Sequence, residues 1–113
     1  MAAPNIDAAR VALLAERDRL RAELADTVIT PGPMTYGSQA AAASHVFEQQ
    51  RDLALRERAE HQLGLVEAAL ERIEAGRFGI CQNCRRPIPT ERLEALPWAA
   101  LCIDCQRAES RGR

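Results

Sequence analysis

The stretch GRFGICQNCRRPIPTERLEALPWAALCIDC, residues 76–105, decides how this chain folds. It holds the four cysteines as two CxxC pairs, Cys81 with Cys84 and Cys102 with Cys105. Residues 85–101 separate the pairs, a spacing typical of a four-cysteine zinc site. Because Zn²⁺ binds four thiolates in a tetrahedron, and each CxxC turn presents two sulfurs, the pattern predicts one structural zinc ion with all four cysteines as ligands.

Other uses of these cysteines fit the sequence less well. Disulfides are rare in the cytoplasm, and a thioredoxin-like redox pair needs a βαβ pattern that is absent here. An iron–sulfur cluster takes the same ligand type, but the paired spacing favours zinc. Four thiolates also close the metal shell, and no catalytic triad, carboxylate pair or phosphate loop is recognisable. We therefore expect a protein that is not an enzyme.

The rest of the composition is that of long helices. Among 113 residues there are two Phe, one Tyr and one Trp, while Ala, Leu, Glu and Arg dominate. So short a chain buries too little apolar surface for a compact globule, and zinc binding supplies the missing folding free energy. The net charge of −1 gives no basic field that would favour nucleic acid. A signal peptide and a membrane-length apolar run are not recognisable, which predicts a cytoplasmic protein.

Two helices are expected before the cysteines. The first covers about residues 5–28, with Asn5 as N-cap. The second runs from a Ser38 cap to about residue 75, where Gly76 takes the C′ position. Each helix carries a narrow apolar stripe suited to pairing. The stripe residues are Ile6, Leu13, Leu20 and Leu24 in the first helix and Ala59, Leu63, Val66, Leu70 and Ile73 in the second.

The stretch TPGPMTYGSQAAAAS, residues 30–44, breaks the helical pattern with two prolines and two glycines. It predicts a chain reversal between the helices, and hence an antiparallel coiled-coil hairpin in a monomer. A linker between helices that pair only in a dimer is the alternative. Because the first helix is shorter, we expect the second to run past it toward the cysteines.

Two domains follow from this pattern. Residues 1–75 form the hairpin, with its tip at about 30–43, and residues 76–113 form a zinc finger with a short C-terminal helix. Within the finger, TERLEAL predicts a short helix that Thr90 caps and that ends before Pro97. The fold class is therefore mainly α. Trp98 is expected to pack in the small core of the finger, and His45 and His61 to be solvated or at the edge of the helix seam.

Residues 76–105 resemble the DksA/TraR family of bacterial C4-type zinc finger proteins. The resemblance rests on the Phe-Gly pair before the first cysteine, the IP…ERLEALP connector and the closing LCIDC. The segment EQQRDLALRERAEHQL resembles the second coiled-coil helix of the family more weakly. The resemblance implies a transcription regulator whose hairpin enters the secondary channel of RNA polymerase, without sequence-specific DNA contact.

The tip departs from the family pattern. Family tips commonly carry two aspartates followed by an alanine, and a gap-free count from Cys81 matches these to Ser38, Ala41 and Ala43. Only the alanine agrees, and no acidic residue occurs between Asp26 and Glu48. With Tyr36, these positions are the candidate effector residues of the tip. The missing acids indicate an output different from that of acidic-tip members, and binding of guanosine tetraphosphate is not implied.

Two other functions compete with this interpretation. A zinc-stapled adaptor for another complex, such as the ribosome, would need no tip acids. A nucleic-acid-binding zinc ribbon would use basic residues of the finger. We interpret those residues (Arg77, Arg85, Arg86 and Arg92) as a solvated rim, because acidic residues are interleaved with the arginines throughout the chain.

Overall fold

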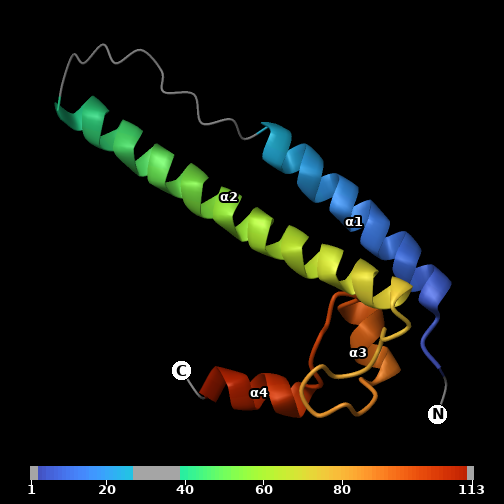
Figure 1. Cartoon of the computed structure of the whole chain (residues 1–113). Helices are drawn as coiled ribbons and strands as arrows, with labels where there is room; N and C mark the ends of the chain where they lie inside the picture. Colours follow the sequence, from blue (N-terminus) through green and yellow to red (C-terminus); the bar gives the residue numbers. More distant parts are fainter. Residues whose placement is uncertain (1–2, 27–38, 112–113) are drawn as a thin grey trace.

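The computed structural model describes residues 3–26 and 39–111. Within these ranges the chain forms α1 (Ile6–Asp26), α2 (Gln39–Glu74), α3 (Thr90–Ala95) and α4 (Ile103–Arg111). The first two helices lie side by side and antiparallel, and the last two belong to a small finger beyond the C-terminal end of α2 (Figure 1). The molecule measures 65 × 32 × 20 Å. The predicted mainly α hairpin with a small finger is confirmed, and none of the described helices is long and apolar enough to cross a membrane.

Local signals fix the two helix ends nearest the finger. The side-chain oxygen Oδ1 of Asn5 accepts a 3.0 Å hydrogen bond from the backbone N–H of Ala8, so Asn5 is the N-cap of α1 as predicted. At the end of α2, Gly76 takes the left-handed conformation, with φ +72°. The N–H of Arg77 then donates to the carbonyl of Arg72 at 2.8 Å, which completes a Schellman turn. This turn directs the chain into the finger.

The seam between α1 and α2 holds the core of the hairpin. Leu13 and Val66 are fully buried and Leu20 is nearly so. Burying a side chain of this size contributes roughly 1.5–3 kcal/mol, so these three residues contribute strongly to the stability of the hairpin. The predicted apolar stripe is wrong at two positions. Ile6 is 43% exposed and lies outside the seam. Ala69 is fully buried but was not included in the predicted stripe.

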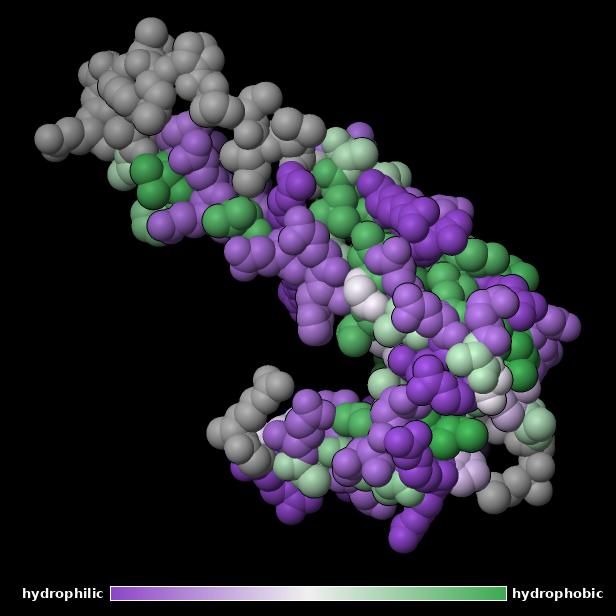
Figure 2. Space-filling view, viewed as in Figure 1, coloured by the Kyte–Doolittle hydropathy of each residue, from purple (hydrophilic) through white to green (hydrophobic). Residues whose placement is uncertain are grey.

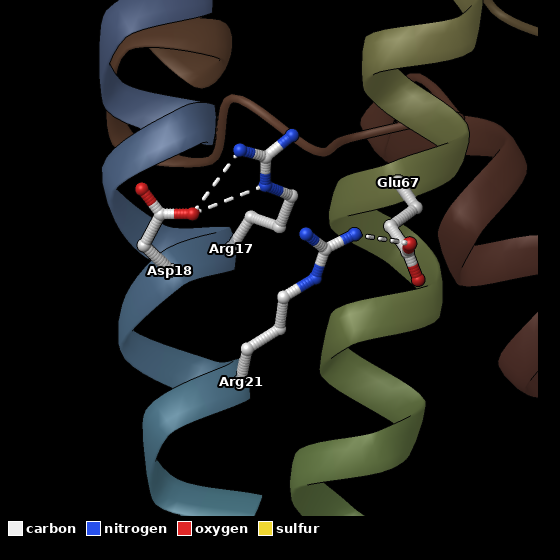
Figure 3. Close-up of polar contacts among 4 residues, drawn as sticks. All are labelled: Arg17, Asp18, Arg21 and Glu67. Atoms are coloured by element: carbon white, nitrogen blue, oxygen red, sulfur yellow. Dashed lines mark hydrogen bonds and ion pairs between the residues drawn. The ribbon is translucent and has the colours of Figure 1, made fainter.

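Ion pairs between the helices report their register. A guanidinium nitrogen of Arg21 in α1 lies 3.3 Å from a carboxylate oxygen of Glu67 in α2 (Figure 3). Arg10 similarly approaches Glu74 at 3.8 Å, whereas Arg17 bonds its neighbour Asp18 within α1. Exposed pairs of this kind contribute about 0–1 kcal/mol each, so the seam stabilises the hairpin far more than they do. The ion pairs are informative about the pairing of the helices, because they place the start of α1 beside the end of α2.

The register of α1 against α2 shows that the expected direction of the overhang was wrong. The longer helix does overhang the shorter one, but α2 extends beyond α1 at the end away from the cysteines (Figure 1). The apolar stripe of α2 begins only at Ala59, so packing α1 on it leaves the earlier half of α2 without α1 beside it. Phe47 is 73% exposed in this half. We call residues 43–55 of α2 the overhang; all of them are exposed except for half-buried His45 and Gln49.

The predicted break falls largely outside the described residues. Tyr36 and Ser38 are among the positions not described, and so is the proposed Ser38 cap. Ala41 and Ala43 lie in the first turns of α2, and Ala43 is exposed.

Candidate metal centre

The first cysteine pair lies on a tight turn after α2. Ile80 and Pro87 form an isolated antiparallel bridge, and between them the N–H of Cys81 donates to the carbonyl of Arg86 at 2.8 Å. The N–H of Arg85 returns a 3.0 Å bond to the carbonyl of Cys81. To close this loop Arg85 adopts φ +65°, a left-handed backbone conformation that is unfavourable for residues with a Cβ atom. The turn therefore presents two sulfurs at the cost of one strained residue.

The second pair is positioned by α4. Cys102 precedes the helix, Cys105 lies in its first turn, and the N–H of Gln106 donates to the carbonyl of Cys102 at 2.9 Å. The second cysteine pair therefore lies at the N-terminal end of α4, where the helix dipole is positive.

The four sulfur atoms meet in one cluster. All lie within 4.8 Å of one another, and the Sγ atoms of Cys84 and Cys102, one from each pair, are 3.8 Å apart. A tetrahedral site with Zn–S bonds of about 2.3 Å has edges of about 3.8 Å, so the cluster has the size that zinc requires. The cysteines are thus positioned to bind one metal ion, as predicted. Four thiolates also complete its coordination, which assigns the ion a structural role.

The cysteines differ in their electrostatics. Burial raises the pKa of Cys81, but hydrogen bonds from the backbone of Cys84, Cys102 and Asn83 outweigh it, so that the pKa falls to about 6. For Cys105 the largest effect is a hydrogen bond from the Asn83 side chain, which lowers the pKa. The neighbouring thiols and burial together raise it to about 12. Sulfurs this close cannot all ionise without a cation, whereas a divalent ion stabilises every thiolate at once.

The Phe-Gly pair before Cys81 packs the finger onto the start of the chain. Phe78 is buried, and Gly79 adopts φ +83°. A Cβ on Gly79 would lie 3.3 Å from both Leu93 Cδ1 of α3 and Pro4 Cγ. The glycine is thus required for the close approach of three segments. The α3 helix itself ends before Pro97 as predicted, but Pro89 occupies its N-cap position without a side-chain cap, so the predicted Thr90 cap is wrong.

A short segment between α3 and α4, residues 98–101, connects the metal centre to the hairpin; we call it the joint. Nη2 of buried Arg72 donates to the carbonyls of Trp98 and Ala99, at 3.3 and 3.4 Å. The next carbonyl, of Ala100, accepts from the N–H of Gln82, and that of Leu101 accepts from Nε of Arg92. Four consecutive carbonyls therefore bind α2, the first cysteine turn and α3, immediately before Cys102.

Sequence reasoning missed most of this arrangement. Arg72 and Asn83 were not singled out, and Arg92, interpreted as part of a solvated rim, is instead half-buried in α3 and hydrogen-bonded to the joint. Arg77, Arg85 and Arg86 are exposed, in agreement with the rim interpretation. Arg72 is the basic residue in the last turn of α2.

An open groove separates the hairpin from α4. Its volume is about 750 Å³, and its lining includes His61 and Leu65 of α2, Trp98 of the joint and Gln106 of α4. Figure 2 shows the hollow between the rod and the finger. Trp98 is half-buried and packs against the core, as expected. His61 is exposed and His45 half-buried in α2, far along the chain from the cysteines.

Comparison with known proteins identifies the fold and the finger together. Residues 76–111 match the family model described as the prokaryotic DksA/TraR C4-type zinc finger. The structure of transcription factor DksA2 from Pseudomonas aeruginosa superposes with a TM-score of 0.75 at 35% identity, over 96% of this chain and 85% of that one. The chain belongs to the DksA/TraR family. This membership covers the hairpin as well as the zinc finger.

Other members of the DksA/TraR family match over different lengths. The RNA polymerase-binding transcription factor DksA from Caulobacter vibrioides is 29% identical over 101 residues, which cover 88% of this chain and 71% of that protein. The protein of the same name from Buchnera aphidicola is 42% identical over 64 residues, 57% of this chain. The matched segments span 24–42% of the length of several curated relatives, the Buchnera protein included.

Proposed function

We propose that this chain is a bacterial transcription regulator that binds RNA polymerase through the secondary channel, without sequence-specific DNA recognition. The observation that carries the proposal is the combination of hairpin and finger shared with DksA2 at 35% identity over most of both chains. The Caulobacter relative, described as RNA polymerase-binding, extends that similarity across 88% of this chain. In this proposal the cytoplasm is the site of action and the zinc ion is structural.

The shape of the molecule supports this mode of binding. The α2 helix has 36 residues, which at 1.5 Å per residue gives a rod about 54 Å long. A rod of this kind can enter a channel too narrow for a globular domain. The metal centre and the joint fix the finger at the base of the rod, where it can contact the outer rim of the channel. The overhang carries Phe47 and Val46 in exposed positions that such a channel would cover.

The tip residues set the expected output. If the family register holds, Ser38 and Ala41 replace the two acidic residues, and no acid is available nearby in the sequence. We propose that the chain occupies the channel through the sides of the hairpin and the finger, and that its effect on initiation differs from that of acidic-tip members. Loss of two carboxylates removes negative charge that would act on the catalytic metal region.

Co-purification with core RNA polymerase tests the proposal. The tagged 113-residue chain should retain the polymerase, and a second factor known to occupy the secondary channel should displace it. The Cys84→Ser variant, which loses a metal ligand, should bind much less. Binding that persists undiminished with the competitor present would place the contact elsewhere on the polymerase. Retention of ribosomes without polymerase would favour an adaptor function instead.

A charge restoration tests the tip separately. Ser38→Asp with Ala41→Asp should leave polymerase binding intact and change the lifetime of open promoter complexes in a purified transcription assay. Ser44→Asp with Gln50→Asp adds the same charge in the overhang, outside the tip positions, and serves as the control. If the two double variants behave alike, the tip positions have no special role, even though polymerase binding stands.

A further inference from the structure

The side chain of Asn83 connects the two cysteine pairs. Asn83 lies inside the first CxxC turn, yet its amide Nδ2 donates a 3.3 Å hydrogen bond to Sγ of Cys105, the last cysteine of the second turn. The two residues are 22 positions apart in the chain. Asn83 is exposed and Cys105 is half-buried in the first turn of α4. The contact therefore bridges the outer side of the cluster.

The cysteines obtain their hydrogen bonds from different sources. Sγ of fully buried Cys81 accepts from the backbone N–H of Cys84 at 3.5 Å, a bond that the turn supplies with any side chain at position 84. The bond to Cys105 depends instead on one amide side chain. Zinc with four thiolates carries a net charge of −2, and N–H donors outside the ligand shell spread that charge and orient the ligands.

We propose that Asn83 is a positioning residue of the metal centre. Its amide holds Sγ of Cys105 in the ligand position and stabilises the zinc-bound thiolate, which tightens zinc binding and slows release of the ion through this sulfur. It also anchors the start of α4 to the first cysteine turn. Because Asn83 touches a ligand and not the metal, replacing it changes the strength of the site without removing a ligand.

Gln82 provides a matched control. It is the other amide between Cys81 and Cys84, but its Nε2 donates to the carbonyl of Ile80 at 3.2 Å and not to a sulfur. Gln82→Ala therefore removes a similar side chain from the same turn without altering a thiolate. Asn83→Asp keeps the shape of the side chain, removes the donor and places a negative charge beside the sulfur. Asn83→Gln keeps an amide donor on an exposed and slightly longer side chain.

The test is zinc affinity measured by competition with a chromophoric chelator on the whole 113-residue chain. Asn83→Ala should weaken zinc binding roughly tenfold and speed zinc transfer to the chelator, as loss of an outer hydrogen bond to a ligand typically does. Asn83→Asp should weaken it further because its charge repels the thiolates. Gln82→Ala should match the wild type, and Asn83→Gln should recover most of the loss.

Cobalt substitution separates electronic from purely structural effects. In the Co²⁺-loaded protein, Asn83→Ala should move the sulfur-to-cobalt charge-transfer band to lower energy, because a thiolate without its hydrogen bond donates electrons more readily. Gln82→Ala should leave that band in place. Unchanged affinity and an unchanged band in Asn83→Ala would overturn the proposal. Equal loss of zinc in all three Asn83 variants, Asn83→Gln included, would also overturn it, since packing and not the donor would then matter.

Discussion

Nη2 of Arg72 lies 3.3 Å from the carbonyl oxygen of Trp98, so the last turn of the long helix is hydrogen-bonded to the segment that leads into the second cysteine pair. Burial lowers the pKa of this guanidinium, and the charge of Arg77 lowers it further. The group nevertheless has two main-chain acceptors, Trp98 and Ala99. Hairpin and finger therefore share one buried polar contact.

Arg72→Met should weaken this contact while keeping most of the side-chain volume. It leaves two carbonyls without their donor, and an unsatisfied buried polar group costs about 1–3 kcal/mol. Trp98 is the single tryptophan, so its fluorescence reports the joint while far-UV circular dichroism reports the helices. We expect the fluorescence transition in urea to move to lower concentration. Arg107→Met, at an exposed site on α4, is the control, and equal shifts in both variants would contradict the role of Arg72.

Gly79→Ala should destabilise the zinc-loaded protein by roughly 1–3 kcal/mol, since alanine disfavours a φ of +83° and its Cβ would crowd Leu93 and Pro4. Gly64 is the matched control. It lies within α2, and a Cβ there meets nothing within 4 Å. Gly64→Ala should therefore stabilise the helix by about 0.5–1 kcal/mol. Urea unfolding of both variants measures the difference, and stabilisation by Gly79→Ala would show that the close approach is not required.

Arg85→Gly should stabilise the first cysteine turn by about 1 kcal/mol, because glycine adopts φ +65° without the strain that a Cβ imposes. The neighbouring Arg86→Gly removes the same charge but lacks this benefit, and its added backbone freedom should cost about 0.5–1 kcal/mol. The midpoint of thermal unfolding with zinc bound checks both. A lower unfolding midpoint for Arg85→Gly than for Arg86→Gly would show that the backbone of Arg85 is not strained.

Zinc affinity should fall as the pH is lowered. The folded pKa of Cys81 is about 6, below its ordinary value of 9.0, so the stabilisation from its thiolate is complete above pH 9.0 and is lost as the pH falls through about 6. The pKa of Cys105 is about 12, so its proton must leave when the metal binds. Chelator competition across this range should show affinity rising with pH. Affinity independent of pH would exclude thiolate ligation.

Cys84→Ser or Cys102→Ser should release the metal and unfold the finger while most of the helical signal remains. The buried seam residues Leu13, Leu20 and Val66 belong to α1 and α2 and not to the finger. Metal content, tryptophan fluorescence and far-UV circular dichroism of the same samples test this. Complete loss of helicity would disprove the proposed division into a hairpin of residues 1–75 and a finger of residues 76–113.

Features set by local rules could be predicted from the sequence. The spacing of the cysteines, the cap at Asn5 and the left-handed Gly76 each depend on a few neighbouring residues, and the structure has them as expected. The direction of the overhang depends on which part of α2 pairs with α1, a tertiary choice that an apolar stripe alone specifies weakly. The same reason explains why Ile6 was assigned to the seam although it is exposed.

The polar part of the site was harder to predict. In the sequence, Arg72 looks like a solvated residue at a helix end, but in the structure it bonds to the joint. Asn83 looks like a spacer between two cysteines, but it bonds to Cys105, 22 positions away. Contacts of this kind join segments distant in sequence, and their residue types are common on surfaces. A pattern of spacings contains no signal for them.

The overhang has a thermodynamic consequence for any complex the protein forms. Without α1 beside it, this half of α2 owes its order to helix propensity, to which the run Ala40–Ala43 contributes. A partner that encloses it removes water from Val46, Phe47 and Leu53, which are now at least 48% exposed. Association should therefore show a negative heat-capacity change, and its enthalpy should grow more favourable on warming. Calorimetry can thus detect contact with this half of the helix before any complex is visualised.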